Sequence, residues 1–135
     1  MPPQKFRELI FLLLFSEELH ASDPDELIAT VAKELKVRPK EVKMAWEKVV
    51  EITDKLQEID ADISAVSTSY DFHRIQKVEL AVLRLSCYEL LFEKKLAASI
   101  VIAEAKRLAK KFATPDAASF CQALLDSVVK IKTLS

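Results

Sequence analysis

The sequence predicts an all-α protein, built as a bundle of about six or seven helices. Three observations support this class. Apolar residues recur every three or four positions along most of the chain, no segment alternates apolar and polar residues as a half-buried strand would, and helix-starting signals precede three of the apolar segments. With 135 residues, half of them hydrophobic, the chain is long enough to form a core without disulfides or a metal.

The N-terminal part predicts two helices. We expect the first over residues 4–19, with an apolar band that contains Phe6, Leu9, Leu13 and Phe15. A short second helix should begin at Pro24, because Asp23 can cap it, proline fits the first helical position and Glu26 can complete a capping box.

Residues 40–66 carry a heptad pattern. Apolar residues alternate in steps of three and four over more than three repeats, at Val42, Ala45, Val49, Ile52, Leu56, Ile59, Ile63 and Val66. Such a narrow seam suits one helix that packs lengthwise against a partner helix. We expect that partner to lie within the same bundle, and a coiled-coil homodimer is the alternative.

Residues 74–92 are apolar on most of a helical circumference, which is typical of a buried helix. We therefore expect this segment to be the central helix. It contains Arg84 and Glu89, and an unpaired buried charge costs on the order of 3 to 5 kcal/mol. We expect a structural ion pair here, or an arginine whose stem reaches the surface.

The C-terminal part predicts two further helices. We expect Ser99 to cap the first of them, and Thr114 with Pro115 to start the last one. A turn-forming stretch before the central helix divides the single domain into two expected helical subdomains, residues 1–68 and 69–135.

Composition excludes several kinds of site. Glycine is absent, so the chain has no P-loop, Rossmann turn, nucleophile elbow or EF-hand. The two histidines, His20 and His73, lack the spacing of familiar metal sites, and we expect neither a metal nor a cofactor. Cys87 and Cys121 lie in apolar helical patterns, as buried free thiols of a reduced compartment do, and we expect a cytoplasmic protein.

No membrane segment is expected. The apolar run from Leu9 to Phe15 is far shorter than the roughly 20 residues that a membrane-spanning helix needs. It follows Lys5 and Arg7 as a signal peptide would, but no small-residue cleavage pattern comes after it.

Charge is unevenly distributed, although the net charge is only −1. Residues 94–112 hold one acid, Glu104, and the basic residues Lys94, Lys95, Lys106, Arg107, Lys110 and Lys111. Residues 51–62 hold one base, Lys55, and the acids Glu51, Asp54, Glu58, Asp60 and Asp62. Two faces of opposite sign suggest two different partners, whereas the plainer interpretation is a solvated surface.

Three segments resemble the NusB family of bacterial transcription antitermination factors. They are VELAVLRLSCYELLF, VIAEAKRLAKKF and TPDAASFCQALLD, beside the family patterns LR-x-x-x-YEL, INEA-x-x-LAK-x-F and FVNG-x-LD. The likeness is clearest over residues 82–126 and extends more weakly to residues 7–15. The resemblance implies a helical bundle of two subdomains that binds boxA RNA of ribosomal leader transcripts together with the ribosomal protein NusE. It also implies work within the transcription elongation complex.

The resemblance implies site residues position by position. Arg7 matches a family arginine, although Leu12 replaces a glutamine and only Lys5 and Arg7 remain of the N-terminal basic cluster. The candidate RNA-binding residues are Gln4, Lys5, Arg7, Phe15 and, as a second patch, Lys94, Lys106, Lys110 and Lys111. Phe15 can stack on a base, and a place in the core is the alternative.

Glu79 and Asp116 match acidic positions of the family, and the resemblance places them at the surface that binds NusE. Two other functions compete with RNA binding. One is a helical protein-interaction module, homodimeric along the heptad seam, that has lost RNA binding. The other is an enzyme domain, since the same fold is appended to ribosomal RNA cytosine methyltransferases. We expect no enzyme and no catalytic residue, because the chain has no glycine-rich cofactor loop and no nucleophilic cysteine motif.

Overall fold

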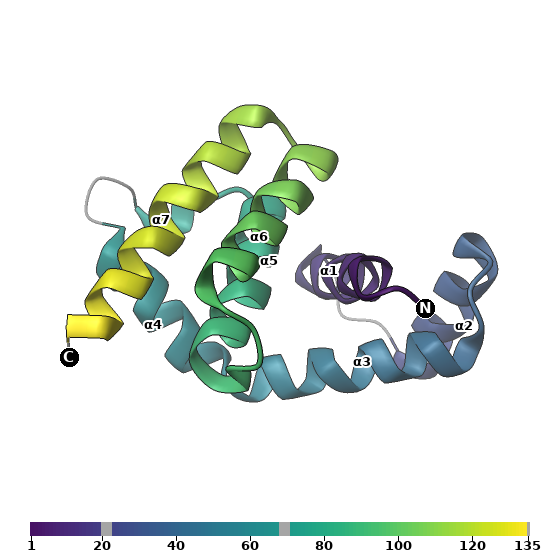
Figure 1. Cartoon of the computed structure of the whole chain (residues 1–135). Coiled ribbons are helices and arrows are strands. Elements are labelled where there is room, and N and C mark those ends of the chain that lie inside the picture. Colours follow the sequence, from purple (N-terminus) through teal and green to yellow (C-terminus); the bar gives the residue numbers. More distant parts are fainter. Residues whose placement is uncertain (20–22, 68–70, 135) are drawn as a thin grey trace. The chain divides into compact units, whose positions relative to one another are not determined.

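The computed structural model describes residues 1–19, 23–67 and 71–134 (Figure 1). All regular structure in these ranges is helical, so the predicted all-α class is confirmed. The elements are α1 (Pro3–Leu19), α2 (Pro24–Leu35), α3 (Pro39–Asp54), α4 (Leu56–Val66), the 3-10 helix η1 (Phe72–Arg74), α5 (Lys77–Tyr88), the π-helical turn η2 (Glu89–Glu93), α6 (Ala98–Phe112) and α7 (Pro115–Leu134).

The chain divides into two compact units, residues 1–54 and 55–135. Helix α4 falls in the second unit because it contacts α5 and α7 there. The boundary predicted between residues 68 and 69 lies outside the described residues and stays a prediction.

In the first unit, α1 and α2 pack on α3. The buried apolar side chains of this unit are Leu9, Ile10, Phe11, Leu13, Leu14, Leu27, Ala32, Val42, Ala45, Val49 and Ile52. Asp23 caps α2 as predicted, and its side chain accepts a hydrogen bond from the backbone N–H of Asp25 at 3.4 Å. Pro24 occupies the first turn beside it.

The continuous helix predicted for residues 40–66 is wrong, because α3 ends at Asp54 and α4 begins at Leu56. Lys55 lies between them with φ −106° and ψ 8°. The apolar spacing continues across Lys55, so nothing in the heptad pattern marks the break. Six of the eight seam residues are buried within the chain, on α3 against α1 and α2 and on α4 against α5 and α7, whereas Leu56 and Val66 are half-buried. The expectation of a partner helix inside the bundle is therefore confirmed.

In the second unit, α5 contacts α4, α6 and α7. Every residue of α5 from Leu80 to Cys87 is buried, which confirms the predicted central helix. Beyond Tyr88 the segment changes to the π-helical turn η2, and Lys94 closes it in the left-handed region with φ 55°. The backbone N–H of Lys94 donates to the carbonyl oxygen of Glu89 at 2.9 Å.

The starts of α6 and α7 differ in their caps. The predicted Ser99 cap is wrong, because α6 begins at Ala98 and Ala97 occupies the capping position with extended backbone. Ser99 therefore lies in the first turn. Thr114 does start α7 as predicted, since its hydroxyl oxygen accepts a hydrogen bond from the backbone N–H of Ala117 at 3.0 Å.

Arg84 is the buried charge at the centre of α5, and it pairs with Asp60 of α4. Its Nε lies 3.0 Å from Oδ1 and its Nη2 lies 2.9 Å from Oδ2 of Asp60. This bidentate geometry is the strong form of an arginine–carboxylate contact. The predicted structural ion pair is confirmed, and it ties α4 to the central helix.

We predict that Asp60→Ala lowers the free energy of unfolding by about 3 kcal/mol, because it leaves the Arg84 guanidinium buried without this carboxylate. Urea unfolding followed by circular dichroism measures the change. Glu58→Ala is the matched control, since Glu58 is an exposed acid on the same helix and its loss should change stability by less than about 0.5 kcal/mol. Equal effects of the two substitutions would contradict a structural role for the pair.

Candidate nucleic-acid and partner surfaces

The N-terminal candidates lie along α1 of the first unit. Gln4 and Lys5 are exposed in its first turn, and Arg7 is half-buried. Phe15 is half-buried and stacks on Phe11, with ring centroids 6.1 Å apart and an interplanar angle of 12°. Because Phe11 is only 1% exposed, it holds Phe15 against the core while part of the Phe15 ring stays accessible. Phe15 is therefore partly in the core, and its stacking on a base stays a prediction.

The basic candidates of the second unit do not form one patch. Lys106 and Lys110 are exposed one turn apart on α6, and Lys111 is exposed beside them with its Nζ 5.6 Å from the ring centroid of Phe112. Lys94 precedes the start of α6, whereas Lys110 and Lys111 lie in its last turn. A helix of this length separates the two groups by about 20 Å. The α6 lysines are therefore one basic surface, and Lys94 belongs elsewhere.

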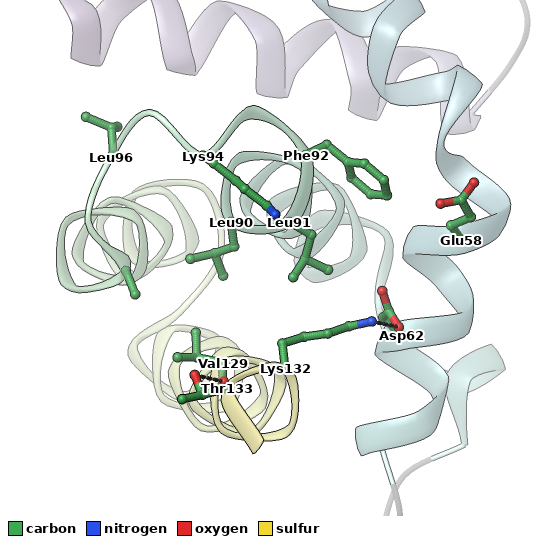
Figure 2. Close-up of a pocket in the computed structure, with 11 residues that line it drawn as sticks. Glu58, Asp62, Leu90, Leu91, Phe92, Lys94, Leu96, Val129, Lys132 and Thr133 are labelled. Atoms are coloured by element: carbon green, nitrogen blue, oxygen red, sulfur yellow. Dashed lines mark hydrogen bonds and ion pairs between the residues drawn. The ribbon is translucent and has the colours of Figure 1, made fainter. Parts of the chain in front are cut away.

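Lys94 lines a hollow of about 520 Å³ in the second unit, formed by α4, η2 and the end of α7. Figure 2 shows its apolar wall of Leu90 and Leu91, with Asp62 of α4 facing Lys132 of α7. Lys132 and Asp62 form an ion pair of 3.1 Å. Acidic and basic side chains are thus mixed here, which is unlike the one-sided basic surface that attracts a polyanion.

Glu79 lies in the first turn of α5 and closes a capping box there. Its Oε1 accepts a hydrogen bond from the backbone N–H of Gln76 at 3.3 Å. Partial burial raises the pKa of the Glu79 carboxyl, and this backbone hydrogen bond opposes the rise. The negative charge of Glu79 also raises the pKa of the Cys121 thiol on α7. A local structural role therefore accompanies any contact that Glu79 makes with a partner.

Asp116 is exposed in the first turn of α7, where the helix dipole favours a negative charge. Only Ala113 and Thr114 separate α6 from α7, so the end of α6 adjoins the start of α7 (Figure 1). The cations of Lys110 and Lys111 and the carboxylate of Asp116 consequently meet at one end of the helix pair. A basic surface and an acidic surface adjoin there.

The thiols offer no nucleophile. Cys87 and Cys121 are buried and free, and burial raises the pKa of each to about 12. Nearby negative charges, including that of Asp62 for Cys87, contribute a smaller part of this rise in pKa. A thiol that stays protonated is neither a nucleophile nor a metal ligand.

Two kinds of feature are absent from the described residues. Those residues contain no group of three histidine, cysteine, aspartate or glutamate side chains placed to hold a metal ion. They also contain no helix that is long and apolar enough to cross a membrane.

The first unit contains a second hollow, of about 550 Å³, which was not predicted from the sequence. It lies between the start of α1 and the start of α3, and its lining includes Met1, Phe6, Arg38, Lys40, Glu41 and Met44. We call it the α1–α3 hollow. A sign of this hollow in the sequence is Met44, an apolar residue outside the heptad seam. In the structure Met44 is 51% exposed.

Comparison with known proteins gives one consistent result. The profile of the NusB family matches residues 4–130. Among curated relatives, the transcription antitermination protein NusB of Chlamydia pneumoniae is 33% identical over 134 residues, covering 99% of this chain and 84% of the relative. NusB of Geobacter sulfurreducens is 31% identical, covering 90% of this chain and 89% of the relative.

Solved structures agree. A structure of T. maritima NusB matches with a TM-score of 0.81 and 30% identity, covering 96% of this chain and 92% of that one. A chain from a crystal structure of antitermination factors NusB and NusE in complex with dsRNA matches with a TM-score of 0.81 and 27% identity. That match covers 95% of this chain and 96% of the other.

Proposed function

The chain belongs to the NusB family, whose members are transcription antitermination factors and not enzymes, and we propose that it binds boxA RNA of ribosomal leader transcripts together with NusE. The observation that carries this proposal is the likeness over nearly the whole chain to a protein crystallised with NusE and RNA. We further propose that the chain acts in the cytoplasm, within the transcription elongation complex.

In this proposal each unit supplies cations for RNA. Lys5 and Arg7 act from the start of α1, and Phe15 offers the accessible part of its ring to a base. Gln4 is a further contact on α1. On the second unit the phosphates lie along the α6 surface of Lys106 and Lys110, with Lys111 as a further contact. Lys94 is a weaker candidate, because it lines a hollow of mixed charge.

NusE is proposed to bind at the acidic end of the second unit. Glu79 and Asp116 lie in first turns, at the starts of α5 and α7. Because Lys110 and Lys111 end α6 just before α7 begins, a protein bound at Asp116 would adjoin RNA bound along α6. This adjacency supports joint binding of the two ligands.

The reduced basic cluster of α1 favours a second candidate, a protein-interaction module without RNA binding. Leu12, half-buried here, replaces a family glutamine, and each lost phosphate contact weakens affinity for RNA. Such a module would bind NusE through Glu79 and Asp116 and would not respond to RNA.

We predict that Lys5→Ala with Arg7→Ala lowers affinity for single-stranded boxA RNA and reduces the slope of log affinity against log salt by about 1.4, which corresponds to two phosphate contacts. Fluorescence anisotropy at several salt concentrations measures both quantities. Lys33→Ala with Lys43→Ala is the matched control, since these are exposed lysines of the same unit outside the proposed surface. Unchanged affinity and slope in the first variant would remove α1 from the site.

We also predict that Glu79→Gln weakens NusE binding by about tenfold while stability stays within about 0.5 kcal/mol of the original, because glutamine can still close the capping box. Glu79→Ala should lower both the affinity for NusE and the stability, because it removes the cap as well as the charge. Calorimetric titration with NusE and thermal unfolding separate the two effects. Full NusE affinity in Glu79→Gln would show that the carboxylate has only its capping role.

A further inference from the structure

The α1–α3 hollow has an apolar floor that is open to solvent. Met1 is 46% and Met44 51% exposed, and the half-buried ring of Phe6 lies with them in the lining. Large apolar side chains with this much exposure are normally scattered singly over a protein surface. Here they line one concavity, and its volume of about 550 Å³ falls in the range of small-molecule sites.

The rim of the hollow is basic. Lys40 lines it and has no ion pair or hydrogen bond with any side chain in the described part of the protein. Arg38 lines it too, and its side chain is 84% exposed although its Nη2 lies 2.9 Å from Oε1 of Glu41. An exposed pair of this kind contributes little to stability, so the guanidinium can exchange the carboxylate for another anion.

The neighbouring sequence adds to this charge. Residues 36–40 contain three cations, Lys36, Arg38 and Lys40, and the acid Glu41 follows them. The hollow therefore combines an apolar floor with cations at its edge. An unstacked nucleotide offers the complementary pair of groups, an apolar base face and a phosphate.

We propose that the α1–α3 hollow is a nucleotide subsite for single-stranded RNA, with one base on Phe6 and Met44 and the adjoining phosphates on Lys40 and Arg38. This inference rests on the proposed RNA-binding function and extends it beyond Lys5 and Arg7. Continuity supports it, because Pro3 and Phe6 of the lining flank Gln4 and Lys5 in the first turns of α1. An apolar side chain of a protein partner would fill the floor but leave the cations of the rim unmatched.

The chain's methionines supply a direct probe. Met1 and Met44 are its two methionines, and both line the hollow. In protein labelled with ¹³C at the methionine methyl groups, the Met44 signal, assigned by its loss in Met44→Ala, should move upfield when single-stranded boxA RNA is added. The upfield direction follows from a base ring that lies over the methyl group. NusE without RNA should leave this signal in place.

Two pairs of variants test the energetics by fluorescence anisotropy. Met44→Ala should weaken RNA binding about fivefold, whereas Val50→Ala, a 45% exposed apolar residue of α3 outside the hollow, should not. Lys40→Ala should weaken binding and lower the salt slope by about 0.7, whereas Lys43→Ala, an exposed lysine of α3 outside the lining, should not. All four sites are exposed, so folding is preserved.

The outcomes separate this inference from the proposed function. RNA that binds and depends on Lys5 and Arg7, but neither moves the Met44 signal nor distinguishes the paired variants, overturns the subsite and leaves the function standing. A Met44 signal that moves with NusE alone makes the hollow a protein-docking site and also overturns the subsite. Failure of all RNA to bind, with or without NusE, overturns both.

Discussion

Burial of α5 is the constraint on which the second unit depends. A helix whose residues are covered from Leu80 to Cys87 needs neighbours on every side, and α4, α6 and α7 supply them. The charged side chain of Arg84 can be buried here because Asp60 accepts two hydrogen bonds from it. That pair also explains why α4 belongs with the second unit.

The candidate functional groups lie outside the buried core of each unit. Helix starts carry Lys5, Glu79 and Asp116, and the solvent face of α6 carries Lys106 and Lys110. Helix ends also set the local electrostatics, since acids are favoured at the starts of α5 and α7 and lysines at the end of α6. The short α6–α7 connection then brings both signs of charge together, which suits a protein that holds RNA beside a second protein.

Apolar periodicity was sufficient to predict the helices, the buried central segment and the need for a partner to Arg84. It reports which side chains are buried and not whether the backbone is continuous, so it could not reveal the break at Lys55. Counting charges along the sequence likewise grouped Lys94 with the α6 lysines, although a whole helix separates them. The α1–α3 hollow could not be predicted because Met44 lies outside the heptad seam. The sequence does not show that the start of α1 lies beside it.

The central claim is that this chain selects boxA RNA and does so better with NusE. The most direct test is the anisotropy of labelled boxA RNA and of a scrambled RNA of equal length, each titrated with the full chain alone and with NusE bound. The account predicts tighter binding of boxA than of the scrambled RNA, and a further gain when NusE is present. Equal affinity for the two RNAs with NusE bound would contradict it.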